Sequence, residues 1–108
     1  MVRIVALHKT PSDPEEYFRY YRDVHTPLVR AVPGVQEIRF GRVTSMPDGT
    51  DPPYFLTSEV YFLNQSDLEQ GAASSEMERC LADVNNFAKP GDVTIMWAEG
   101  IDATRAES

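Results

Sequence analysis

Hydrophobic and polar residues alternate with two different periods along this chain, and each period predicts one kind of element. Apolar residues at every second position predict strands over 2–8, 35–44, 54–63 and 93–98. Apolar residues at helical spacing predict a helix over 14–32 and a second helical region that starts at Ser66, is interrupted over 71–75 and resumes over 76–87. The order βαββαβ is typical of a ferredoxin-like α+β fold, a four-stranded antiparallel sheet with two helices on one face.

The ends of the first helix are well marked. Ser12 or Asp13 can cap it, and Pro14 suits its first turn. Pro27 lies inside the helical pattern and removes one backbone donor. We therefore expect the helix to bend or break near residues 23–24.

The first and third strands carry apolar side chains on both faces. In the first strand, Val2, Ile4 and Ala6 alternate with Val5 and Leu7. One face of such a sheet packs under the helices, and the other needs a separate cover because a large exposed apolar patch is unfavourable. A second copy of the chain, packed sheet to sheet, is the simplest cover, and the pattern predicts a homodimer.

Charge and cysteine content narrow the function classes. Of the 108 residues, 17 are Asp or Glu and 10 are Lys or Arg, so the net charge is −7. With no basic run, the chain lacks the features of nucleic-acid binding and of attachment to anionic membranes. A single cysteine, Cys80, allows no internal disulfide. Without a signal-peptide pattern or a long apolar run, we expect a cytoplasmic protein with one domain over 1–100 and a polar tail over 101–108.

His25 is the best candidate for chemistry. It shares the apolar face of the first helix with Tyr17, Phe18, Tyr21, Val24 and Leu28. Its ordinary pKa of about 6.5 suits proton transfer at neutral pH. The alternative is a core histidine that bonds a backbone carbonyl or Asp83 and only stabilises the fold.

Other residues are weaker candidates. Tyr17 and Tyr21 can bond an oxygen of a ligand, or they can be ordinary core residues. Glu59 stands in an apolar strand and could form a proton-shuttling pair with His25 if its face is buried. Asp83 could orient His25 through a ring nitrogen.

Several residues carry little functional weight. Arg39 or Arg42 could bind a carboxylate but suits the surface, Trp97 suits the core or an interface, and Cys80 suits a buried thiol. His8 and His25 have no ligand spacing that supports a metal site. No phosphate loop or dinucleotide motif is present, and we expect neither a cofactor nor a metal.

A set of motifs resembles the EthD-domain family. The residues are Phe18-x-x-Tyr21-x-x-x-His25-x-Pro27-Leu28, then Pro33-Gly34-Val35, a hairpin, and Ser66…Ser74-Ser75-Glu76…Asp83…Phe87. The resemblance spans 2–97 and implies a dimeric α/β barrel with a small-molecule cavity between sheet and helices. The family's histidine falls on His25, and its later aspartate and phenylalanine fall on Asp83 and Phe87. Its relatives include an isomerase and cofactor-free polyketide-modifying enzymes.

Three functional hypotheses follow. The first is a cofactor-free isomerase, cyclase or dehydratase that acts on a cyclic or aromatic carbonyl compound, with His25 as general acid and base and Tyr17, Tyr21, Glu59, Asp83 and Phe87 around the substrate. The second is a non-catalytic accessory protein that binds an apolar ligand in the same cavity. The third, by fold analogy alone, is an oxygenase of the same superfamily.

Overall fold

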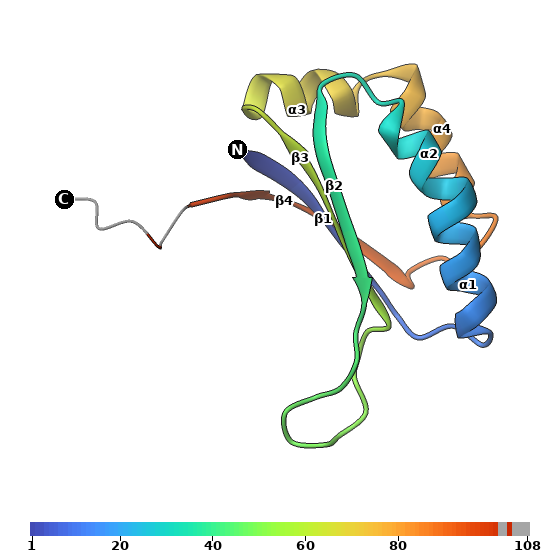
Figure 1. Ribbon diagram of the computed structural model, residues 1–108. Helices are drawn as coiled ribbons and strands as arrows, with labels where there is room; N and C mark the ends of the chain where they lie inside the picture. The colour runs from blue at the N-terminus through green and yellow to red at the C-terminus, as the bar shows by residue number, and fades with distance from the viewer. Residues whose placement is uncertain (102–103, 105–108) are drawn as a thin grey trace.

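The computed structural model describes residues 1–101 and 104 and has the ferredoxin-like order that the sequence predicts. The strands are β1 (Val2–His8), β2 (Val35–Arg42), β3 (Leu56–Phe62) and β4 (Val93–Glu99). The helical segments are α1 (Pro14–Tyr20), η1 (Tyr21–His25), α2 (Thr26–Arg30), α3 (Gln65–Ala72) and α4 (Ser75–Val84). The sheet order is β2-β3-β1-β4, with all neighbours antiparallel. Figure 1 shows α1, α2 and α4 along one face of the sheet.

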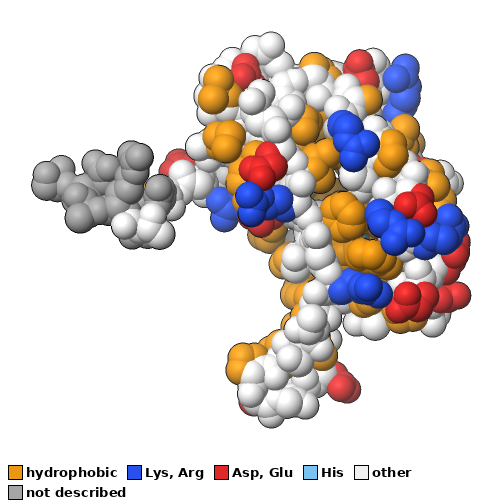
Figure 2. All heavy atoms as spheres, in the orientation of Figure 1, with side chains coloured by type: hydrophobic (Ala, Val, Ile, Leu, Met, Phe, Trp, Pro, Cys, Tyr) orange, Lys and Arg blue, Asp and Glu red, His pale blue; other side chains and the backbone are white. Residues whose placement is uncertain are grey.

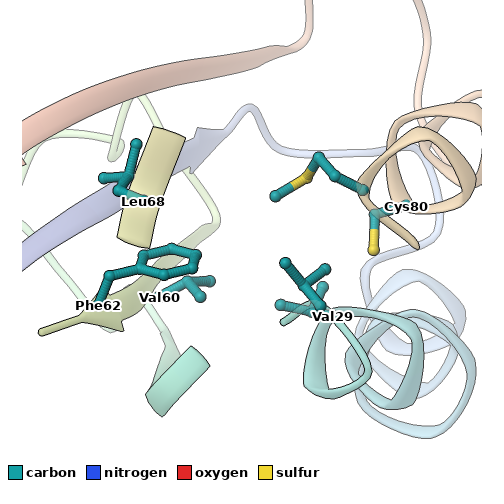
Figure 3. Close-up of a cluster of buried hydrophobic side chains, with 7 residues drawn as sticks. Val29, Val60, Phe62, Leu68 and Cys80 are labelled. Atoms are coloured by element: carbon teal, nitrogen blue, oxygen red, sulfur yellow. The ribbon is translucent and has the colours of Figure 1, made fainter. Parts of the chain in front are cut away.

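The core lies between this face and the helices. The side chains of Leu56, Phe62 and Leu68 have no exposed surface. In Figure 3, Val60, Phe62 and Leu68 lie on one side of the cluster, and Val29 and Cys80 face them from the helices. Burial of these apolar groups is the main favourable contribution to folding, at roughly 1.5–3 kcal/mol for each large side chain.

The helix starts agree with the sequence in one case and differ in two. The carboxylate of Asp13 accepts a hydrogen bond from the backbone N–H of Glu16 at 3.2 Å, which starts α1. Asn64 caps α3, which begins at Gln65 and not at Ser66, and Ser74 caps α4, which begins at Ser75 and not at residue 76. Both corrections move the start of the helix by one residue, because a preceding side chain accepts the capping bond.

The predicted break at Pro27 takes the form of a π-helical turn, η1. The backbone N–H of Thr26 bonds the carbonyl of Tyr21, five residues earlier, and the Thr26 hydroxyl donates to the same oxygen at 2.8 Å. Such a wide turn accommodates Pro27, which has no N–H to donate. Tyr21 and His25 are buried, at 4% and 6% exposed. Val24, expected on the buried face, is instead 38% exposed.

The second and third strands are shorter than predicted, and the hairpin loop between them is correspondingly longer. β2 ends at Arg42 and β3 begins at Leu56, whereas the pattern extended the two strands to 44 and from 54. In β3 the side chains of Leu56, Ser58, Val60 and Phe62 are buried under the helices. The intervening Thr57, Glu59 and Tyr61 therefore belong to the other face.

The helix-free face is mixed in character. β1 contributes Val5 and Leu7 to it, but Arg3 of the same strand forms a 2.8 Å ion pair with Glu59 of β3. The expected apolar patch is thus interrupted by charge. On the different side seen in Figure 2, where β2 is in front and the helices lie at the right, acidic and basic side chains again lie beside one another. Most of the predicted tail over 101–108 lies outside the described residues.

A substitution at Gly71 can test how tightly α3 packs on the sheet. A Cβ at this position would lie 2.8 Å from Cε2 of Phe62 and 2.9 Å from the carbonyl oxygen of Pro33. We expect Gly71→Ala to lower the free energy of unfolding by roughly 1–3 kcal/mol, because a backbone carbonyl and a buried ring must move. Urea denaturation measures this change. Gly41→Ala is the matched control, since nothing lies within 4 Å of its Cβ, and equal stabilities for the two variants would contradict the packing.

Candidate active site

A cavity of about 260 Å³ lies between the helices and the sheet, next to the core. Apolar side chains from β1, β3, β4, α2 and α4 form most of its wall. Leu81, Ile95 and Trp97 line it and are also 50%, 44% and 53% exposed. The cavity therefore opens to the outside between α4 and the edge strand β4. Trp97, expected in the core or an interface, stands at this opening.

His25 lines the cavity from η1, and Asp83 of α4 holds its ring. The Nδ1 atom of His25 lies 2.9 Å from Oδ2 of Asp83, and both side chains are buried. Because Nδ1 donates to the carboxylate, Nε2 of the neutral ring has a free lone pair. Nε2 makes no hydrogen bond to the described part of the chain. It is also not among the buried polar atoms that have neither a partner nor accessible surface. It is the atom through which His25 can meet a bound molecule.

The carboxylate of Asp83 is itself fully engaged. Its Oδ1 accepts hydrogen bonds from the hydroxyl of Tyr20 at 2.7 Å and from Nδ2 of Asn86 at 2.9 Å. Burial by itself would raise the pKa of Asp83, but the hydrogen bonds it accepts lower the pKa below its ordinary value. Asp83 therefore stays ionised and keeps the proton of His25 on Nδ1.

Burial decides the charge state of His25. It lowers the pKa of the imidazole below the ordinary 6.5, and the hydrogen bond to Asp83 opposes this effect only in part. The ring is consequently neutral at pH 7. A neutral imidazole with a free Nε2 lone pair can accept a proton, which is the state a general base requires.

Two hydroxyl groups share the cavity wall with His25. Tyr21 lies one turn before it on η1, and Ser58 projects from β3. Burial raises the pKa of Tyr21, and the nearby Ser58 side chain opposes that shift. The phenol is therefore protonated and can donate a hydrogen bond.

An aromatic cluster packs against the His25 ring. The ring of Phe87 lies 5.0 Å from that of His25 and 5.2 Å from that of Tyr17. The hydroxyl of Tyr17 lies 2.6 Å from Nδ1 of His8, and neither residue lines the cavity. Tyr17 and Phe87 thus belong to the packing around His25 and do not line the cavity.

Glu59 does not belong to the cavity. Its neighbours Ser58 and Val60 face the helices, so the alternation of β3 turns Glu59 to the helix-free face, where it pairs with Arg3. Glu59 thus lies on the opposite face of the sheet from His25, and the condition for the expected pair, burial on the same face, is not met. Arg39 and Arg42 bond surface carboxylates. In the described residues, no group of three or more His, Cys, Asp and Glu could hold a metal ion.

Comparison with known proteins agrees with the motifs. A family model described as the EthD domain matches residues 9–91, most of the chain. The chain belongs to the EthD family. An uncharacterised 11.0 kDa protein in the thcB-thcC intergenic region of Rhodococcus erythropolis is 32% identical over 99 residues, which cover 92% of this EthD chain and 94% of that protein.

Solved structures of other proteins have the same fold as this EthD chain. The crystal structure of an ethyl tert-butyl ether d (EthD) family protein from Bacillus halodurans superposes with a TM-score of 0.86 at 28% identity, over 94% of this chain and 99% of that one. A dimeric ferredoxin-like protein of unknown function from Thermobifida fusca gives 0.64 at 13% identity, over 89% and 87%. SnoaB, a cofactor-independent oxygenase from Streptomyces nogalater, gives 0.68 at 9% identity, over 94% of each. The last two show the fold alone.

Sequence reasoning missed four residues around this EthD site. Tyr20 and Asn86 bond Asp83, Ser58 lines the cavity, and His8 packs beside Tyr21 with ring centroids 5.1 Å apart. A signal existed for two of them. Alternation along β1 puts His8 on the face of Ile4 and Ala6, and alternation along β3 puts Ser58 between buried Leu56 and Val60. Among the residues that the structure describes, none of the helices has the length and apolar character needed to cross a bilayer.

His8 makes the stability of the EthD domain depend on pH. Burial, with a smaller contribution from the charge of His25, lowers the pKa of His8 from 6.5 to about 4. The unfolded chain binds this proton below pH 6.5 and the folded chain does not, so stability is complete above pH 6.5 and is lost as the pH falls towards 4. His8→Gln removes the titration. Between pH 7 and 4.5 we expect wild type to lose roughly 2 kcal/mol more unfolding free energy than the variant.

Urea denaturation at the two pH values measures this difference. His25, Tyr17 and Tyr21 are the titratable groups that face His8 from the helices, and all three remain in the variant. Parallel losses in wild type and His8→Gln would show that His8 is not buried in its neutral form.

Proposed function

We propose that this EthD protein binds a small cyclic or aromatic carbonyl compound in its cavity, and that His25 acts on it as general base and then general acid without a cofactor. The observation that carries the proposal is the arrangement of His25, with Nδ1 fixed by buried Asp83 and Nε2 free at the wall of an apolar cavity. A base oriented by a carboxylate is the usual arrangement of a histidine that transfers protons.

The elementary step is proton transfer at the carbon next to a carbonyl group. Nε2 of His25 takes the proton, and the electrons of the broken C–H bond move to the carbonyl oxygen to give an enolate. The imidazolium returns a proton to a carbon of the same molecule, so no external reactant is consumed. Ionised Asp83 stabilises the imidazolium while the enolate exists. Isomerisation uses this step as it stands. In dehydration the imidazolium gives its proton to the oxygen of the leaving hydroxyl group, which departs as water, and in cyclisation to the oxygen of the carbonyl group that the enolate attacks.

The cavity wall also supports a non-catalytic alternative. Apart from His25, Tyr21, Ser58 and Cys80, the residues that line it are apolar, so an apolar compound could be held there without any reaction. A carrier of this kind returns its ligand unchanged, whereas a catalyst exchanges protons with it.

Deuterium exchange into 2-tetralone, a bicyclic aromatic ketone, distinguishes the two. We expect the wild-type protein in D₂O to accelerate exchange next to the carbonyl, and His25→Gln to lose on the order of 10²-fold or more of this acceleration, because the base is removed. Proton NMR follows the signal loss. The pKa of His25 is lowered, so exchange should be constant above pH 6.5 and fall only at lower pH.

The chain's second histidine provides the matched control. His8→Gln is the same substitution at a residue that does not line the cavity, and its exchange rate should stay within a few-fold of wild type. Binding of 2-tetralone without accelerated exchange would favour the carrier. Equal exchange by wild type and His25→Gln would remove His25 from the mechanism.

We also propose that two chains form a homodimer through the helix-free face of the sheet. Val5 and Leu7 of β1 and Met96 of β4, which is 44% exposed, supply apolar surface there. Two-fold packing of this face would cover it and pair its charges with those of the partner. The dimeric ferredoxin-like protein from Thermobifida fusca supports the possibility for this fold.

Val5→Glu tests the interface. The new carboxylate would stand between Glu59 and Met96, which are the cross-strand neighbours of Val5, so we expect the dimer to dissociate at micromolar concentration. Light scattering gives the mass. Val24→Glu, at an exposed valine on the outer side of η1, is the control and should leave the dimer intact. A wild-type mass of one chain would overturn the proposal.

A further inference from the structure

Ser58 is a polar residue where the fold favours an apolar one. It lies in the middle of β3, on the face where Leu56, Val60 and Phe62 form the core, and it is 3% exposed. Its neighbour in the cavity wall is the hydroxyl of Tyr21, with which it forms a hydrogen bond. Its oxygen is not among the buried atoms that lack a partner. Burial of a hydroxyl is unfavourable unless its hydrogen bonds are made, and an alanine would fit the same strand position.

The hydroxyl of Tyr21 is buried beside it. Tyr21 is 4% exposed and lines the cavity, and its oxygen is likewise not among the buried atoms that lack a partner. Its hydrogen bond with Ser58 opposes the rise that burial causes in the pKa of the phenol, so the two hydroxyl groups lie next to each other. Together with Nε2 of His25, they are three polar atoms that face one cavity from η1 and β3.

The remaining wall is apolar and leads outward. Val60 and Val29 flank the polar atoms, and the wall continues to Leu81, Ile95 and Trp97 at the opening. A molecule that satisfies both parts has one oxygen at its inner end and an apolar ring system that extends towards β4. Hydrogen-bond donors placed where negative charge develops are also the arrangement that stabilises an enolate oxygen.

We infer that Ser58 and Tyr21 together bind the carbonyl oxygen of the ligand, with the apolar part of the ligand directed to the opening at Trp97. This inference rests on the proposed function for the class of ligand, and it adds Ser58 as a binding residue and a fixed orientation. If the Ser58 hydroxyl only stabilised the fold, Ser58→Ala would lower the stability of the protein. If it serves to bind a ligand, the substitution should leave the stability unchanged or raise it.

Matched probes test the oxygen contact directly. 2-Tetralone and tetralin have the same ring system, and tetralin lacks the carbonyl group. We expect Ser58→Ala to weaken binding of 2-tetralone about fivefold, as for the loss of one hydrogen bond, and to leave binding of tetralin unchanged. Its thermal stability should equal or exceed that of wild type. Tyr21→Phe should weaken 2-tetralone in the same selective way, and Cys80→Ala, at another residue of the wall, should change the two probes equally.

The orientation has its own readout in the fluorescence of Trp97, the single tryptophan of the chain. Both probes should quench it, because both place a ring at the opening.

Each outcome decides between the two proposals. If 2-tetralone and tetralin bind wild type equally, or lose affinity equally in Ser58→Ala, the oxygen contact is wrong while binding in the cavity stands. If neither probe binds wild type, the proposed function fails and this inference fails with it. Should Tyr21→Phe not fold, the ratio of the two affinities in wild type and Ser58→Ala still decides the question.

Discussion

The hydrogen bond between His25 and Asp83 is the constraint on which the site depends. It joins η1 to α4 across 58 residues of sequence. Both partners are buried, so a carboxylate left alone there would be strongly unfavourable. Tyr20 and Asn86 both donate hydrogen bonds to the other oxygen of the Asp83 carboxylate. The position of α4, the tautomer of His25 and the wall of the cavity are therefore set by one satisfied polar network.

The two layers of the fold contribute different residues to the site. The helical layer supplies His25, Tyr21 and Asp83, whose geometry depends on two helices staying in contact. The sheet supplies Ser58 between two paired strands, where the backbone is held on both sides. A ligand between the layers would meet groups from both. The free energy that it gains by binding would therefore also hold the layers together.

Much of the fold was predictable because it depends on local periodicity. The helix and strand patterns gave the element order, and the motif around His25 pointed to the residue with the best geometry. The open question at Glu59 and the omission of Ser58 have one origin, since adjacent residues of a strand face opposite sides and the prediction did not decide which side was buried. Tyr20 was missed for another reason. Its partner Asp83 is 63 residues away, and no local pattern indicates such a contact.

The π-helical turn over Tyr21–His25 has a consequence for how this segment tolerates change in length. Its hydrogen bonds span five residues instead of four, so the turn holds one residue more than an α-helical turn. If one exposed residue such as Val24 were removed, the turn could close with α-helical hydrogen bonds while α1 and α2 kept their places. The change would fall on the site itself, because Tyr21 and His25 lie within the turn and the face that each presents depends on its wider spacing.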